Sequence, residues 1–309
     1  MQAFEQLNKR EKFTNFCFYV FIALLPIIGL ISISTYAFIY LKEDLDFVSK
    51  ELDGLHVITQ VQESAFKYQR LRGLSSIASC ECQDSNKKIF NDIIKLKQEI
   101  SQDLLTLTKR IRSKQSSTLQ KELLNYLEAL DPHNGPTDFE SLSKTIYQLL
   151  YFSSKISYEC NLKLESHLES YIMADNVVSL LPNIIEYNGQ IRAVSSAIQN
   201  KRLTQEQQEH IHMQLSKLQD HLDLLRFHYS ILSSFHVYAQ LEKNYQNMLD
   251  AQDEIIHIVR NRLLHKESVE INGLNIYLLI TNNIDLIIEL YRSNAKYLQK
   301  ELQEKYDGT

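Results

Sequence analysis

Residues 211–232 read IHMQLSKLQDHLDLLRFHYSIL, and their apolar side chains recur at alternating steps of four and three. An α-helix completes one turn in about 3.6 residues, so such steps place these side chains on one face. The positions concerned are Ile211, Leu215, Leu218, Leu222, Leu225, Tyr229 and Leu232. A strict seven-residue repeat is the seam expected where near-parallel helices pack in a bundle.

The composition of the whole chain also favours helices. The 309 residues include 7 Gly, 4 Pro and no Trp, so the turn residues that sheets require at regular spacing are scarce. A second apolar stripe runs at steps of three and four through Ile93, Leu96, Ile100, Leu104, Leu107 and Ile111. We therefore predict an all-α fold in which long helices pack up and down.

Helix boundaries follow from capping residues and turn residues. The ranges expected to be helical are 43–80, 87–113, 117–130, 137–164, 167–200, 204–235, 237–266 and 271–306. In a capping box, a hydroxyl and the side chain three residues later satisfy free backbone N–H groups at the start of a helix. We expect such boxes at Ser117 with Gln120, Thr137 with Glu140, and Thr204 with Gln207. The turn DPHNGP at residues 131–136 is the clearest break, and we place a boundary between sub-bundles near 131–137.

A membrane span is predicted near the N-terminus. Residues 13–41 carry no charge, and as a helix they would extend about 43 Å, against a hydrocarbon core of roughly 30 Å. Basic residues precede the segment and acidic residues follow it, namely Lys9, Arg10 and Lys12, then Glu43, Asp44 and Asp46. The positive-inside rule therefore predicts a single-pass protein of the bacterial inner membrane, with residues 1–12 in the cytoplasm and residues 42–309 outside it.

The alternative to a membrane anchor is a cleaved signal peptide. A signal peptide has an apolar core of about 7 to 15 residues followed by a site with small side chains. The apolar run is longer than this, and Tyr36, Phe38 and Tyr40 near its end are bulky. Residues 276–291 do not form a second span, because polar side chains interrupt them.

Several classes of function are not indicated. The net charge of −5 and the lack of a run of like charges argue against a nucleic-acid surface. No phosphate loop, nucleophile elbow or paired carboxylate site is present, so we expect neither an enzyme nor a cofactor or metal. In an oxidising compartment, Cys80 or Cys82 could pair with Cys160 in a disulfide. If all three cysteines met, a metal or redox sensor would be the alternative.

Two short segments share one pattern that points to a binding site. Residues 72–76 read RGLSS and residues 192–196 read RAVSS. On a helix, the serines lie one turn beyond the arginine on the same face, which groups Arg72 with Ser75 and Ser76, and Arg192 with Ser195 and Ser196. If both faces point inward, two guanidinium groups and four hydroxyls would line a pocket suited to nitrate, nitrite or a carboxylate.

A structural role is the other interpretation of these arginines. Buried arginines are more often the partners of internal carboxylates than ligands for small molecules. Glu165, Glu169 and Asp175 are available for such pairing.

Five stretches, in this order, resemble a known family. They are ELDGL at 51–55, QRLRGLS at 69–75, CNLKLESHLESYIMAD at 160–175, LPNIIEYNGQIRAVSSAIQNKRLT at 181–204, and TNNID at 281–285. Together they resemble the extracytoplasmic helical sensor domains of bacterial chemotaxis receptors, sensor histidine kinases and diguanylate cyclases, of the nitrate/nitrite-sensing type. The chain departs from that pattern at Cys160, at residues 165–166 and at Ala193, so the resemblance does not identify the ligand.

The resemblance implies two packed four-helix bundles and a ligand bound between helices, with Arg72 as a contact and Arg192 as a second. It also implies a homodimer that transmits a helix shift across the membrane. No kinase, cyclase or coiled-coil output module is found before Thr309, so we expect this module in a longer chain or in a partner. The alternative function is a membrane-anchored helical scaffold that binds a protein partner and no small molecule, marked by an apolar stripe left exposed.

Overall fold

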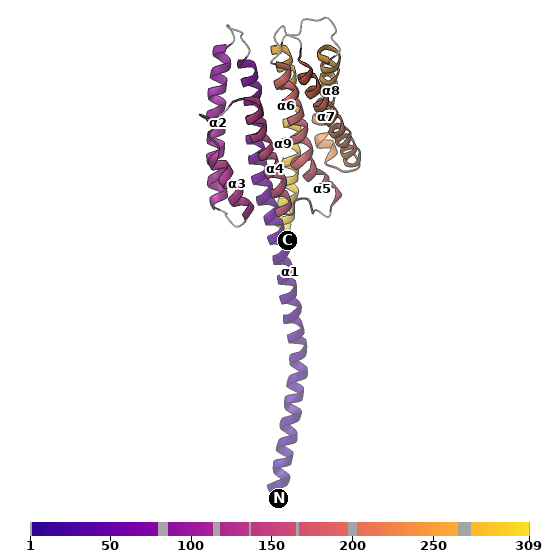
Figure 1. The fold of residues 1–309 in the computed structure, drawn as a ribbon. Coiled ribbons are helices and arrows are strands. Elements are labelled where there is room, and N and C mark those ends of the chain that lie inside the picture. Colours follow the sequence, from indigo (N-terminus) through magenta and orange to yellow (C-terminus); the bar gives the residue numbers. More distant parts are fainter. Residues whose placement is uncertain are drawn as a thin grey trace. The chain divides into compact units, whose positions relative to one another are not determined.

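A computed structural model describes residues 2–79, 86–113, 118–135, 137–164, 167–196, 203–264 and 273–308. Within these ranges the chain is helical or forms turns, and no strand is present (Figure 1). The prediction of an all-α fold is therefore confirmed for the described residues.

The order of helices follows the prediction closely. The α-helices are α1 (Gln2–Ala78), α2 (Asn86–Ser113), α3 (Thr118–Ala129), α4 (Phe139–Glu159), α5 (Leu168–Asp175), α6 (Leu181–Ser196), α7 (Gln205–Leu232), α8 (Tyr238–Ile258) and α9 (Gly273–Gly308). Two π-helical segments interrupt this pattern: η1 (Asn176–Leu180) joins α5 to α6, and η2 (Val259–Leu264) follows α8. The sequence predicted continuous helices at both places, because a π turn leaves little trace in apolar spacing.

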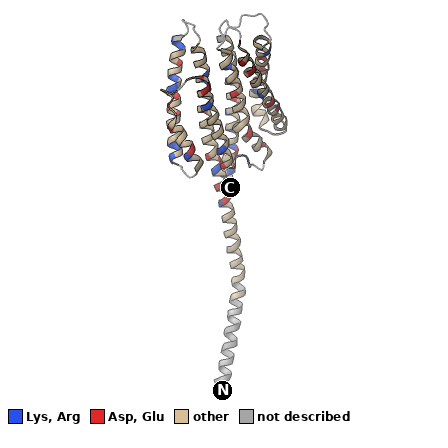
Figure 2. Cartoon of the chain, in the orientation of Figure 1, with Lys and Arg blue, Asp and Glu red and all other residues tan. Residues whose placement is uncertain are grey.

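The chain divides into two compact units, and the first contains Met1–Ser49 and Lys305–Thr309. Its part of α1 is helical through Pro26, and large apolar side chains such as Leu30 and Ile33 are more than two-thirds exposed. Figure 2 shows an uncharged stretch in this part of α1. Among the described residues, α1 is long and apolar enough to cross a membrane, a property that a signal sequence shares.

The second unit, Lys50–Glu304, holds the remaining helices and the apolar core. All seven apolar side chains of the predicted stripe at 211–232 lie in α7 and are at most 3% exposed. The stripe on α2 is buried from Leu96 to Ile111, whereas Ile93 near its start is half-buried. Apolar spacing therefore identified the inward faces of both helices correctly.

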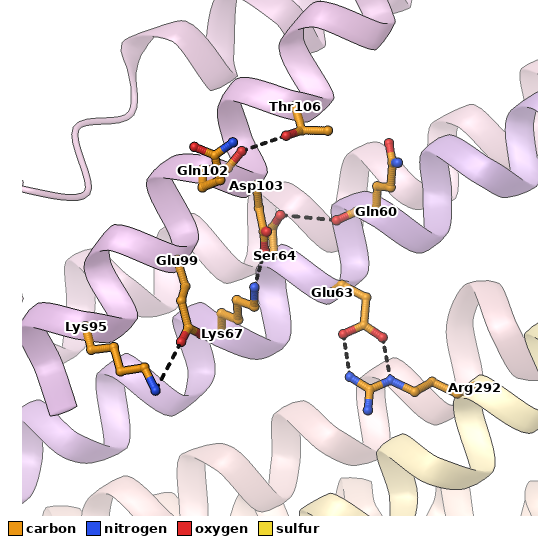
Figure 3. Close-up of polar contacts among 10 residues, drawn as sticks. All are labelled: Gln60, Glu63, Ser64, Lys67, Lys95, Glu99, Gln102, Asp103, Thr106 and Arg292. Atoms are coloured by element: carbon orange, nitrogen blue, oxygen red, sulfur yellow. Dashed lines mark hydrogen bonds and ion pairs between the residues drawn. The ribbon is translucent and has the colours of Figure 1, made fainter.

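Ion pairs tie α1 to helices that are distant in sequence. Glu63 on α1 accepts two hydrogen bonds from Arg292 on α9, each 2.7 Å long (Figure 3). Lys67, one turn further along α1, pairs with Asp103 on α2. The C-terminal half of α1 therefore lies beside both α2 and α9.

The predicted helix caps have different outcomes. Thr204 forms the expected capping box with Gln207. The box predicted at Thr137 is wrong by one residue: Asp138 caps α4, and its carboxylate accepts from the backbone N–H of Ser141 at 2.9 Å. A carboxylate at this position also interacts favourably with the helix dipole. Ser117 of the third predicted box lies outside the described residues.

Candidate functional site

The two predicted arginines are both buried in the second unit. Arg72 on α1 has no exposed surface, and Arg192 on α6 is 1% exposed. They are the largest fully buried side chains in the described chain. Both motifs therefore point inward, as the site hypothesis required.

Arg72 is neutralised by a carboxylate on α6. Its two terminal nitrogens donate to the two carboxylate oxygens of Glu186, at 2.7 and 3.0 Å. Gln69 and Gln190 each donate a further hydrogen bond to this carboxylate, at 2.9 and 2.7 Å. A paired, hydrogen-bonded geometry of this kind is what allows two charges to be buried together.

Further contacts hold the guanidinium of Arg72 in place. It donates to the hydroxyl of Ser143 on α4 at 2.8 Å. It also lies 5.3 Å from the ring centre of Phe139, near the start of α4, within the range of a cation–π interaction. Arg72 therefore joins α1, α4 and α6.

The sequence suggested that a carboxylate would pair with Arg72, but it did not identify which carboxylate. Of the carboxylates suggested from the sequence, Glu169 accepts from the hydroxyl of Tyr297 and Asp175 pairs with Lys163. Glu165 lies outside the described residues. Glu186 was missed, although a single acid inside the apolar run of residues 177–191 was a usable signal.

Arg192 has no such partner. It donates to the hydroxyl of Thr281 on α9 at 3.1 Å and to the backbone carbonyl of Gln69 at 2.9 Å, and it lies 5.2 Å from the ring centre of Tyr277. None of the described carboxylates forms an ion pair with it, and its Nε has no hydrogen-bond partner. Burial lowers the pKa of Arg192, and the positive charges of Arg72 and Arg70 lower it further, against opposing contributions from Tyr277 and Asp285.

Two glycines bring the arginines close to the facing helices. A Cβ atom at Gly73 would lie 3.0 Å from Nε of Arg192, and a Cβ atom at Gly189 would lie 3.0 Å from Nη2 of Arg72. Each guanidinium therefore packs on a glycine of the opposite helix. The glycine of α1 is Gly73, directly after Arg72, and the matching glycine on α6 is Gly189.

The four predicted serines do not form the expected lining. Ser76 and Ser196 donate to backbone carbonyls of their own helices, those of Arg72 and Ala193. The hydroxyls of Ser75 and Ser195 are enclosed and have no hydrogen-bond partner. The bonds of Ser76 and Ser196 follow the general competition of local backbone carbonyls for serine hydroxyls in helices.

A groove of about 360 Å³ reaches this cluster from the surface. It runs between α4, α6 and α7, and its lining includes Ser143, Glu186 and Gln190, all of which belong to the Arg72 network. The groove therefore connects the ion pair with solvent, and Arg192 is not part of its lining.

The predicted pairing of Cys80 or Cys82 with Cys160 stays a prediction, because only Cys160 lies in the described residues. Cys160 is a free, buried cysteine whose side chain packs on Gly54 of α1, and burial raises its thiol pKa to about 11. Cys80 and Cys82 lie outside the described residues. Among the described residues, no group of His, Cys, Asp and Glu is arranged to hold a metal ion.

Comparison of the chain with protein families, curated proteins and solved structures gives no match. The resemblance to nitrate/nitrite-sensing domains therefore stays a prediction.

Proposed function

We propose that this chain is the extracytoplasmic sensing part of a bacterial membrane receptor, which binds a small anion between its helices. In this proposal residues 13–41 anchor the protein in the inner membrane with the N-terminus in the cytoplasm. Helices α1 to α4 form one four-helix bundle, and the continuous helix α5–η1–α6 together with α7, α8 and α9 forms a second one packed against it. The boundary between the bundles then lies after α4 rather than near residues 131–137. Contacts between α2 and α3, α3 and α4, and α6 and α7 are compatible with this arrangement.

The observation that supports this function most is the unneutralised guanidinium of Arg192. A fully buried positive charge that lacks a carboxylate partner is costly to the fold. Charged groups retained at such a cost are characteristic of binding sites. A planar oxyanion would supply the missing negative charge and accept from the free Nε, which is the geometry that guanidinium groups match best.

The closed packing around Arg192 suggests how binding would be coupled to a change of shape. Its Nε and the hydroxyl of Ser195 are enclosed by the surrounding helices, so an anion would have to separate α6 from α1 or α9 to reach them. A ligand that binds better to the separated packing would shift the equilibrium towards it. The shift would then be carried along α1 towards the membrane, and we expect a homodimer to transmit it.

A test uses the full chain in detergent micelles and differential scanning calorimetry. The panel is nitrate, nitrite, formate and acetate, with chloride as the reference anion. An anion present at 100 times its Kd adds about 2.7 kcal/mol to stability, which for a domain of this size raises Tm by roughly 5–10 °C. We expect such a rise for at least one anion.

Two conservative variants locate the site. Arg192→Lys keeps the charge but loses the planar pair of donors, so we expect it to abolish the rise in Tm. Arg292→Lys, in an arginine whose side chain is 61% exposed, should leave the rise unchanged. No rise from any anion in the panel, or an equal rise in Arg192→Lys, would contradict the proposal.

A scaffold that binds a protein is the second candidate, and one observation favours it. Tyr147, Tyr151 and Tyr158 are 65%, 44% and 64% exposed, and their spacing places them on one face of α4. Exposed aromatic side chains at such density often mark protein contacts. A scaffold predicts that no anion changes Tm and that a photo-crosslinker at position 147 gives one discrete adduct in cells.

A further inference from the structure

A cavity of about 690 Å³ lies between α1, α2, α4 and the loop that follows α3. Ligand pockets in proteins usually measure roughly 300–1,000 Å³. The lining of this cavity includes neither Arg72, Glu186 nor Arg192. It is therefore a separate space from the groove that reaches the ion pair.

One part of the lining is apolar and well packed. Leu71 on α1 and Leu142 on α4 are 1% and 3% exposed, and the ring of Tyr68 is buried beside them. Ala129 and Leu130 at the end of α3 add further apolar surface. Tyr68, Leu71 and Leu142 belong to the core, whereas Ala129 is exposed and Leu130 is half-buried, so the open apolar surface of this wall comes from the end of α3 and suits a small hydrocarbon or aromatic group.

The other part of the lining carries two lysines and a phenol. Lys144 on α4 is exposed and forms no ion pair with any described residue. The phenol of Tyr68 is not hydrogen-bonded to a described residue, and burial raises its pKa, so it stays protonated. Lys97 on α2 adds a second positive charge near the loop and donates to the carbonyl of His133 at 3.0 Å.

The acid in the lining is already engaged by the loop. Asp131 accepts from the backbone N–H groups of His133 and Asn134, at 3.0 and 3.1 Å, and these bonds lower its pKa. The backbone of Gly135 closes the same turn on the carbonyl of Asp131 at 2.7 Å. Hydrogen bonds therefore fix the loop wall, and the carboxylate of Asp131 is directed to its own turn.

We propose that this cavity binds a small organic carboxylate with an apolar body. The carboxylate interacts with the ammonium of Lys144 and the phenol of Tyr68, and the apolar body packs on Ala129 and Leu130, beside the buried Leu71 and Leu142. Such a ligand accepts from the phenol and adds a negative charge to a lining in which two lysines, Lys97 and Lys144, face one carboxylate, that of Asp131. The site is independent of the proposed anion site at Arg192.

On both α1 and α4, a residue that lines the cavity is followed directly by a residue of the Arg72 network. Leu71 and Leu142 line the cavity, and the residues that follow them, Arg72 and Ser143, are hydrogen-bonded to each other at 2.8 Å. A ligand that presses α1 and α4 together or apart therefore acts directly on this bond.

The test is calorimetric titration of the full chain in detergent micelles with benzoate, 4-phenylbutyrate and benzamide. We expect saturable binding of the two carboxylates, and binding of the neutral benzamide that is at least about tenfold weaker, because it lacks the charge-assisted bonds. Lys144→Met and Tyr68→Phe should each weaken benzoate binding by about three- to tenfold.

Two further variants separate the site from the rest of the surface. Ala129→Phe places a ring in the cavity from an exposed helix end and should abolish binding. Lys121→Met removes an exposed lysine of α3 that does not line the cavity and should leave the Kd unchanged. The proposal is overturned if neither carboxylate binds saturably, if benzamide binds as tightly as benzoate, or if Ala129→Phe keeps the wild-type Kd.

Discussion

Arg72 and Arg192 begin two segments of the same pattern, and both are buried beside a glycine of the opposite helix. Arg72 has a carboxylate, two glutamines and a serine around it, and its charge is balanced by Glu186. Arg192 has a hydroxyl, a carbonyl and an aromatic ring, none of which carries a negative charge. Two segments of similar sequence can thus both bury an arginine, while the presence of a carboxylate that neutralises its charge depends on residues far away in the sequence.

The largest expected effect tests this difference directly. Arg72→Met leaves the buried carboxylate of Glu186 without its partner and should lower the free energy of unfolding by about 3–5 kcal/mol. Arg192→Met removes a buried charge that has no partner, so relief of desolvation offsets the lost hydrogen bonds. We expect its free energy of unfolding to stay within about 1 kcal/mol of the wild type.

Guanidinium chloride unfolding of the full chain in detergent measures both values. Glu63→Ala, which breaks the exposed pair with Arg292, is the reference and should cost at most about 1 kcal/mol. Equal losses for the two arginine variants would show that Arg192 is neutralised after all.

A smaller effect is expected at the hydroxyl beside Arg192. Thr281→Val keeps the shape of the side chain but removes one of the two acceptors that Arg192 has. Hydrogen bonds to charged groups contribute about 1.5–3 kcal/mol, so we expect a loss in that range, measured by the same unfolding experiment. Thr106→Val on the exposed face of α2 is the matched control and should change little. An effect no larger than that of the control would indicate that Thr281 does not solvate the charge.

The smallest expected effect is a pH dependence near Arg72. His210 packs on Phe139, and burial, and next the positive charges of Arg72 and Lys217, lower its pKa, against opposing contributions from Glu186 and nearby acids. Because its pKa is lower in the folded than in the unfolded protein, the unfolded protein binds more protons below pH 6.5. Stability should therefore fall as the pH drops from 7 to 5.

The imidazole can be removed to check this assignment. Thermal unfolding between pH 7 and 5 should show a weaker pH dependence in His210→Asn than in the wild type. The exposed His212→Asn should behave like the wild type. If His210→Asn keeps the full pH dependence, another group is responsible.

The sequence was informative wherever the governing interactions are local. Apolar spacing gave the inward faces of α2 and α7, and the Thr204 capping box was read correctly, because both depend on residues within a few turns. The π turns at η1 and η2 were missed, since one added residue in a helix hardly disturbs the apolar pattern.

The site was only partly predictable for the same reason. The repeated motif singled out both arginines but left open whether they face inward, and the bond between Arg72 and Glu186 joins residues 114 positions apart. Nothing in a single sequence specifies such a pair. The serines were assigned to the pocket because they share a face with the arginines, whereas Ser76 and Ser196 bond to carbonyls one turn back in their own helices.

The reciprocal seating of each guanidinium on a glycine also has a mechanical consequence. Arg72 of α1 packs over Gly189 of α6, and Arg192 of α6 packs over Gly73 of α1. These two reciprocal contacts fix the axial position of each helix relative to the other. If one helix moved along its axis by one residue, about 1.5 Å, both guanidinium groups would meet residues that have a Cβ in place of the two glycines. The C-terminal half of α1 is therefore expected to move together with α6, so that an axial displacement of one of these helices displaces the other by the same amount.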